Sequence, residues 1–280
     1  ASIAPWSFWK GTIVELTLVA PTAAPASSFT AAVVRTVDLA TIAPPSPDPS
    51  GLAYLSNSNT LLISDGEVDE TVGGITHFQG ANVWELTLSG SVIRTANISK
   101  VTPSFVRMSN EPPGAAWNPN NGHYYFSDDD ARRVYDLNPG TDGLLGTVDD
   151  SWTSFDTLAA GSVDPEGITI DSVNNQIFIA DGTNIEIYQF SLTGTLLGHF
   201  DVEQFGVLDP ESVEYNPDSG TLLVLSNHTS PLIAEVTTSG ALLRIIDISA
   251  ANAYAPAGLA YAPASDGSGA PCPIAVDAPA

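Results

Sequence analysis

The most constraining feature of this sequence is a motif of about 50 residues that recurs along most of its 280 residues. Each copy opens with a short Pro-containing segment that ends in a small residue, and continues with apolar segments separated by turns. The copies begin Asp48-Pro49-Ser50-Gly51, Glu111-Pro112-Pro113-Gly114, Asp164-Pro165-Glu166-Gly167, Asp209-Pro210-Glu211-Ser212 and Ala255-Pro256-Ala257-Gly258. Their spacing of 45 to 63 residues is typical of four-stranded β-propeller blades.

The third copy shows most clearly what one repeat contains. Residues 168–171, 176–181, 186–190 and 196–202 are rich in Ile, Phe and Tyr, and they alternate as half-buried strands do. Asn174-Asn175 supplies a turn between the first two segments. The sequence therefore predicts four strands per repeat, in an all-β chain.

The fifth copy is incomplete, because only its first two strands, 259–261 and 273–277, precede the end of the chain. Segments 12–18 and 33–39 resemble the third and fourth strands of other copies. We expect strands from both termini to form the last blade, which leaves no unpaired edge. The count gives five blades in one domain, 1–280; six blades are the alternative, and would need about 40 more residues.

The predicted domain has an N-terminal arm and five consecutive blades. The arm, 1–11, carries the aromatic residues Trp6, Phe8 and Trp9. The approximate blade boundaries are 48–100, 101–160, 161–205, 206–250, and 251–280 together with 12–40.

Charge narrows the range of partners. The chain has 32 acidic and 8 basic residues, a net charge of −24, so nucleic acids and anionic membranes would be repelled while divalent cations would be attracted. No apolar run is long enough for a membrane helix. The first residue is Ala1 rather than Met, as in a mature protein after signal cleavage, so we expect a secreted or cell-surface protein. Cys272 is the single cysteine and cannot form an internal disulfide.

Three acidic segments are candidate Ca²⁺ sites, because Ca²⁺ takes six to eight oxygen ligands. Two follow predicted second strands, with a further acid at the same place in the third copy, and one is a Gly-containing loop. The candidate ligands are Asp65, Glu67, Asp69 and Glu70; Asp128, Asp129 and Asp130, with Asp181; and Asp142, Asp149 and Asp150. The alternatives are a solvated acidic loop, neutralisation of Asp128–Asp130 by Arg132 and Arg133, and a plain Gly-rich hairpin extension.

A second set of acids lies at the starts of the innermost strands, which surround one mouth of the central channel. This set is Asp48, Glu111, Asp164 and Asp209, with Glu166 and Glu211 two residues after the last two. Converging carboxylates raise one another's pKa or share a cation. The alternative is that Asp-Pro simply initiates a turn. His77, in the long insertion of the first repeat, and Asn82 after it are further candidates for this mouth.

The third copy resembles the NHL, SMP-30 and YncE-type propeller repeats through Pro165–Asp171 and Ile177–Gly182. Segments Leu61–Glu70 and Asn138–Asp150 are more similar to propeller domains of bacterial exported, calcium-associated proteins. The resemblance implies a propeller and bound Ca²⁺. In SMP-30-like lactonases the metal is held by a Glu, an Asn and an Asp, which Glu166, Asn82 and Asp181 match only loosely.

Sequence motifs of hydrolytic nucleophiles, phosphate loops and zinc proteases are absent. We therefore expect a non-catalytic, calcium-stabilised propeller module that binds a protein, a glycan or other copies of itself. The alternative is a Ca²⁺-dependent lactonase, phosphoesterase or glycosidase that uses acids at the channel mouth.

Overall fold

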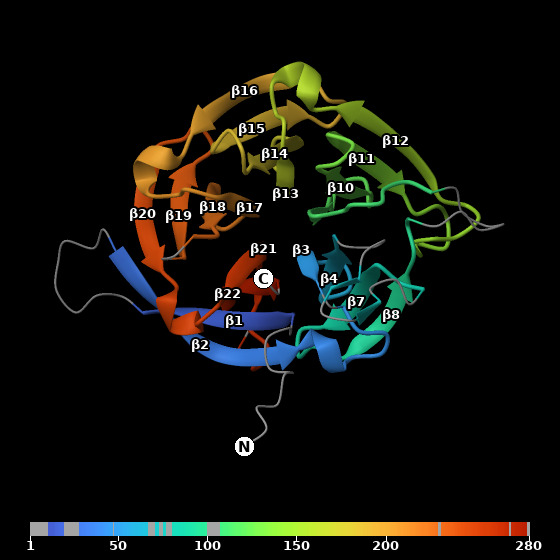
Figure 1. Cartoon of the computed structure of the whole chain (residues 1–280), viewed down its shortest axis with the longest axis horizontal. Coiled ribbons are helices and arrows are strands. Elements are labelled where there is room, and N and C mark those ends of the chain that lie inside the picture. The colour runs from blue at the N-terminus through green and yellow to red at the C-terminus, as the bar shows by residue number, and fades with distance from the viewer. Residues whose placement is uncertain are drawn as a thin grey trace.

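The computed structural model describes residues 11–19, 28–46, 48–66, 71–72, 75–76, 80–99, 107–228, 231–268 and 270–278. These residues form β-strands and a few single-turn 3₁₀ helices, and the strands gather into sheets around a central axis (Figure 1). The prediction of an all-β, propeller-like chain is confirmed. Among these residues, no helix is long and apolar enough to cross a membrane.

Three sheets contain four antiparallel strands each, in the sequential order that the repeat predicts. The first contains β3 (Pro49–Leu55), β4 (Thr60–Asp65), β7 (Val83–Thr87) and β8 (Val92–Ala96). The second contains β9 (Ala115–Trp117), β10 (Tyr124–Asp128), β11 (Arg133–Asn138) and β12 (Ser151–Asp156). The third contains β13 (Pro165–Asp171), β14 (Gln176–Asp181), β15 (Glu186–Ser191) and β16 (Leu196–Asp201). The insertion of the first repeat adds a small hairpin of β5 (Thr71–Val72) and β6 (Ile75–Thr76).

The remaining strands form one eight-stranded sheet that joins the two ends of the chain. Its order is β17 (Pro210–Asn216), β18 (Thr221–Ser226), β19 (Leu232–Thr237), β20 (Leu242–Asp247), β2 (Ser28–Asp38), β1 (Thr12–Val19), β22 (Pro271–Ala278) and β21 (Ala255–Pro263). β1 pairs with both β2 and β22, so the predicted closure by strands from both termini is confirmed. β2 begins earlier than expected, and its residues 28–30 pair in parallel with residues 245–247 of β20.

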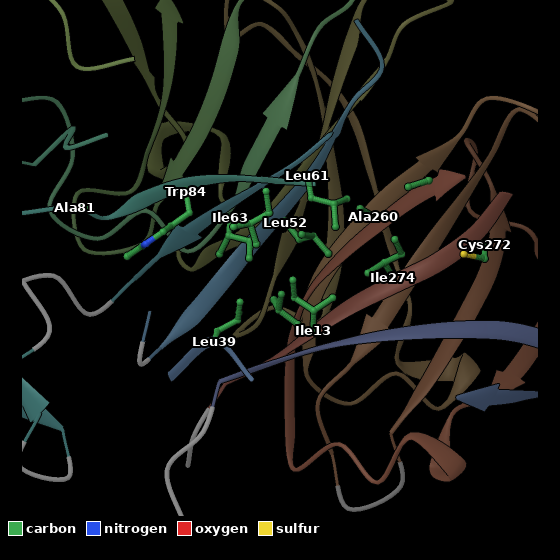
Figure 2. Packing of buried hydrophobic residues seen from close by; sticks show 13 residues of the cluster. Ile13, Leu39, Leu52, Leu61, Ile63, Ala81, Trp84, Ala260, Cys272 and Ile274 are labelled. Atoms are coloured by element: carbon green, nitrogen blue, oxygen red, sulfur yellow. The ribbon is translucent and has the colours of Figure 1, made fainter. Parts of the chain in front are cut away.

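The hydrophobic core lies between neighbouring sheets, because each sheet buries both faces against the next one around the axis. Figure 2 shows the cluster between the first sheet and the closing strands, where Leu61 and Ile63 of β4 face Ile13 of β1 and Ile274 of β22. Similar clusters fill the other interfaces, and Phe178, for example, is fully buried between the third sheet and β17–β19. Burial of this kind is the main stabilising contribution to folding.

The innermost strands touch so closely that only a small residue fits at the fourth position of the motif. A Cβ atom placed on Gly167 of β13 would lie 2.5 Å from Ser212 Cα of β17, and one on Gly114 would lie 2.6 Å from the backbone oxygen of Glu166. The next contact joins β17 to β21, since Ser212 Oγ accepts a hydrogen bond from the N–H of Leu259 (3.2 Å). β21 in turn contacts β3, since a Cβ on Gly258 would lie 2.4 Å from Ser50 O. Gly51 of β3 in turn abuts Gly114. The inner strands therefore form a closed ring: β3, β9, β13, β17, β21 and β3 again.

Candidate cation site at the channel mouth

A buried aspartate at the end of the second strand of three repeats fixes the loop that leads into the innermost strand. Asp181 Oδ2 accepts hydrogen bonds from the backbone N–H groups of Val163 (2.8 Å) and Asp164 (3.2 Å), and its Oδ1 accepts one from Asn184 (2.7 Å). Because such charge-assisted bonds are strong, they hold Asp164, and Glu166 after it, in place at the mouth of the channel.

The two equivalent residues, Asp65 and Asp128, are held in the same way. Asp65 Oδ2 accepts from Ser46 Oγ (2.8 Å) and the Asp48 N–H (3.1 Å), and Asp128 accepts from Ser109 Oγ and the Ala131 N–H (2.6 and 2.7 Å). We predicted all three aspartates as Ca²⁺ ligands. Since their oxygens are engaged as acceptors within the fold, we leave them out of the site proposed below.

Three other carboxylates meet at the mouth. Ligand oxygens of Asp129, Asp164 and Glu166 lie within 4.8 Å of one another. Asp129 follows β10, Asp164 precedes β13, and Glu166 is the second residue of β13. The backbone leaves room for them at Gly182, where an added Cβ would lie 3.2 Å from Asp164 Oδ2 and 3.5 Å from Glu166 Cγ.

Two further acids come from the next repeat. Asp209 Oδ1 lies 3.8 Å from the same added Cβ position at Gly182. Glu211, on β17, accepts a long hydrogen bond from Asn227 Nδ2 (3.4 Å). Asp164 Oδ2 also accepts a hydrogen bond from Thr183 Oγ1 (2.7 Å). The mouth thus gathers acids from the second, third and fourth repeats.

Burial and mutual repulsion set the protonation of this cluster. Burial, followed by the negative charges of Glu211, Asp129, Asp164 and Asp209, raises the pKa of Glu166 to about 10. Burial and the charges of Asp209, Asp164 and Asp48 raise the pKa of Glu211 to about 7. Burial, with the charges of Asp128, Asp130 and Asp164, raises the pKa of Asp129 to about 6, and burial raises the pKa of Asp209 as well. Without a counter-ion, Glu166 therefore keeps its proton at neutral pH.

The donor set fits a hard divalent cation. Asp129 Oδ1 is buried and has no hydrogen-bond partner in the described part of the chain, although buried polar atoms normally have one. A cation beside this oxygen would supply the missing interaction and would offset the burial and the repulsion that keep Glu166 protonated. Carboxylate oxygens are the ligands that Ca²⁺ prefers.

Other predicted mouth residues are placed differently. Asp48 lies near enough to raise the pKa of Glu211, and Glu111 lies before β9, where its N–H donates to Ser109 Oγ (3.2 Å). The expectation that Asn82 faces the channel is wrong, because its buried amide is bonded to Ser99 Oγ (2.6 Å) and the Ile98 N–H (2.9 Å) after the outermost strand β8. Consequently the loose set of Glu166, Asn82 and Asp181 is not assembled.

Several predicted residues lie elsewhere or outside the described residues. Glu67, Asp69, Glu70, His77 and the aromatic arm are outside them. Asp130 is exposed next to the mouth.

The glycine-containing loop brings Asp142, Asp149 and Asp150 within 4.8 Å of one another. Asp149 Oδ2 accepts hydrogen bonds from the N–H and hydroxyl of Thr141 (2.7 and 2.9 Å), and Asp150 Oδ2 accepts one from the Gly146 N–H (2.7 Å). Hydrogen bonds from Thr147 and Thr141 lower the pKa of Asp149. The loop thus supplies its own donors, and Ca²⁺ binding there stays a prediction.

The sequence predicted the mouth acids as candidate site residues, but it did not predict which of them lie together. Asp129 was assigned to a run with Asp128 and Asp130, but the structure joins it to Asp164 and Glu166 of the next repeat. The available signal was the repeat itself, since Asp129 is the counterpart of Gly66, Gly182 and Asn227 after the second strand.

Comparison with known proteins supports the fold. No model of a known protein family matches the sequence, and no curated protein sequence is significantly similar to it. A chain of a solved nidogen–laminin complex is similar in structure, with a TM-score of 0.52 and 14% identity over 90% of this chain and 81% of that one. A candidate 6-phosphogluconolactonase from Bacteroides uniformis has a TM-score of 0.48 and 13% identity over 98% of both chains. A luciferin-regenerating enzyme has a TM-score of 0.49 and 12% identity over 82% of this chain and 91% of that one. At 14% identity, the similarity to the chain of the nidogen–laminin complex shows a propeller-like fold only.

Proposed function

We propose that this chain is a five-bladed, calcium-binding β-propeller module without catalytic activity of its own. The observation that carries the cation site is the meeting of Asp129, Asp164 and Glu166, in which Asp129 Oδ1 is buried without a hydrogen-bond partner among the described residues. Glu211 and Asp209 supply further oxygens nearby. The closed ring of innermost strands supports the blade count.

The module is proposed to act outside the cell, as a secreted or surface protein, and to bind a macromolecule. Its net charge of −24 and the meeting of Asp129, Asp164 and Glu166 at the mouth favour cations over anionic partners. A protein partner is the leading class, because a similar propeller-like fold occurs in a nidogen–laminin complex; glycans and other copies of this chain are the alternatives.

Thermal unfolding tests the cation site. A ligand that binds only the folded state stabilises it by about 2.7 kcal/mol at a concentration 100 times its Kd. For a domain of this size we expect millimolar Ca²⁺ to raise the Tm by roughly 5 °C above its value in EDTA. Identical melting curves in Ca²⁺ and in EDTA would contradict the proposal.

A matched pair of variants locates the ion. Asp129→Asn removes a mouth ligand, while Asp149→Asn changes the exposed loop acid that already accepts hydrogen bonds from Thr141. We expect Asp129→Asn to remove most of the Ca²⁺-dependent Tm increase and Asp149→Asn to retain it. The opposite result would move the site to the loop.

A hydrolase is the second candidate, and one observation favours it. General acid catalysis by carboxyl groups requires one protonated acid near ionised ones, and Glu166, with its pKa of about 10, lies beside Asp164 and Asp129. Lactones, aryl phosphates and aryl glycosides should be assayed both in EDTA, where Glu166 keeps its proton, and with added Ca²⁺. Turnover that disappears in a folded Glu166→Gln variant would establish the enzyme and overturn the non-catalytic proposal.

A further inference from the structure

A cavity lies at the opposite end of the channel from the acidic mouth. It has a volume of about 530 Å³, within the range of small-molecule sites. The late residues of all the inner strands line it, for example Tyr54 of β3, Trp117 of β9, Thr169 of β13 and Tyr261 of β21. Glu166 and Thr169 belong to the same strand, so the two sites are separated along it by about 10 Å.

Four aromatic residues line the cavity among the described residues. Tyr54, Trp117 and Tyr261 are half-buried, and Tyr215 is almost fully buried. Two of the hydroxyl groups are tied to the protein, since Tyr54 donates to Asn59 Oδ1 (2.8 Å) and Tyr261 donates to Asp218 Oδ2 (3.1 Å). These bonds hold both rings in position at the wall of the cavity.

The charged groups of the lining are exclusively acidic. Among the described residues, the cavity is lined by Glu214 and Asp218 and by no Lys, Arg or His. Glu214 projects from β17 near the axis, where its Oε2 accepts a hydrogen bond from Thr169 Oγ1 (2.7 Å) and its Oε1 accepts one from the Tyr261 N–H (3.1 Å). Each carboxylate oxygen has further lone pairs, and Glu214 is a half-buried residue of the cavity lining.

We propose that this cavity binds a small organic cation of the alkylammonium or quaternary ammonium class. Aromatic faces attract such cations through their ring quadrupoles, and Glu214 and Asp218 supply the opposite charge. Anionic ligands are repelled by both carboxylates. A neutral sugar could stack on the same rings but would gain nothing from the two charges.

Proton linkage is a consequence of this assignment. Burial raises the pKa of Glu214 to about 7, so the carboxyl is half ionised at neutral pH. The other titratable groups around it are Asp218 and Tyr54, Tyr215 and Tyr261, with Asp171 next to Tyr215. Burial raises the pKa of all three tyrosines, that of Tyr261 to about 12, so they stay neutral. A cation should therefore bind roughly tenfold more tightly at pH 8 than at pH 6.

Titration calorimetry on the full chain tests the proposal with choline chloride, its neutral isostere 3,3-dimethyl-1-butanol, and cellobiose, in buffer with saturating Ca²⁺. We expect choline to bind at least about tenfold more tightly than either neutral probe, since only choline gains from the cation–π and charge interactions. Equal affinities, no choline binding, or tighter binding of cellobiose would overturn it.

Variants assign the binding to this cavity. Trp117→Ala should weaken choline binding about tenfold, and Glu214→Gln, which preserves the side-chain volume, should weaken it and abolish the pH dependence. Glu203→Gln, in the exposed 3₁₀ turn Glu203–Phe205 outside the cavity, is the control and should leave choline affinity unchanged. If Glu214→Gln keeps wild-type affinity and pH dependence, or if Glu203→Gln removes binding, the assignment is wrong.

Discussion

Replacing Glu166 by glutamine tests the electrostatics of the acidic mouth, because glutamine keeps the shape of the side chain and never carries its charge. Glu166 has a pKa of about 10 in the folded protein, against an ordinary value of 4.5. Between these two values the unfolded chain has released the proton and the folded chain retains it. Stability therefore falls as the pH rises, by about 1.36 kcal/mol for each pH unit.

The magnitude follows from these values. At pH 7 the raised pKa of Glu166 lowers the free energy of unfolding of the wild-type protein by about 3 kcal/mol, and this loss is absent below pH 4.5. Without metal, Glu166→Gln should be more stable than wild type by up to this amount at pH 7. The difference should increase by about 3 kcal/mol from pH 5.5 to pH 7.5.

Urea unfolding in EDTA at these two pH values measures the difference. The matched control is Glu203→Gln, since Glu203 is exposed in a single 3₁₀ turn outside the cluster. The free energy of unfolding of this variant should stay within about 0.5 kcal/mol of the wild-type value at both pH values. With saturating Ca²⁺ the advantage of Glu166→Gln should shrink or reverse, because the ion loses a charged ligand. A Glu166→Gln variant that follows the Glu203→Gln control in EDTA would refute the reasoning.

Two further predictions concern the scaffold. Gly167→Ala places a Cβ 2.5 Å from Ser212 Cα, about 1 Å inside normal carbon contact, and should lower the free energy of unfolding in urea by about 1–3 kcal/mol. The control is Gly198→Ala, whose Cβ meets nothing closer than 3.9 Å and which should be near neutral. Equal stabilities of the two variants would contradict the close packing of the inner strands. Asp181→Ala removes the acceptor for the N–H groups of Val163, Asp164 and Asn184, and should lower the free energy of unfolding by about 3 kcal/mol. Asp201→Ala removes one exposed acceptor, for the Glu203 N–H, and should lower it by less than about 1 kcal/mol.

The sequence predicted the arrangement of strands well, because strands and turns depend on local patterns that each repeat states again. The alternation in residues 176–181 matches β14, and the likeness of 12–18 to third strands placed β1 beside β22. The early start of β2 was not predictable, since residues 28–30 are ordered by pairing with β20 of another repeat, a contact without a local signal.

The sites were less predictable, because they depend on which side chains from different repeats meet. Asp65, Asp128 and Asp181 look like metal ligands in the sequence, but backbone N–H and hydroxyl groups of the preceding loops use their oxygens. The aromatic cavity was missed entirely. Tyr54, Trp117 and Tyr261 each read as an ordinary strand end, and only the closing of the ring places them around one space.

The placement of the mouth acids shows how a repeat of equal units produces a single acidic cluster. The third position of the motif is Ser50, Pro113 and Ala257 in three copies, and acidic only at Glu166 and Glu211. Asp129 likewise stands where the first and third repeats have Gly66 and Gly182. Because these departures fall in the consecutive second, third and fourth repeats, the negative charge is concentrated on one side of the axis, between β10, β13 and β17. A cation is therefore expected to lie off the axis against these strands, where the small Gly182 leaves it space.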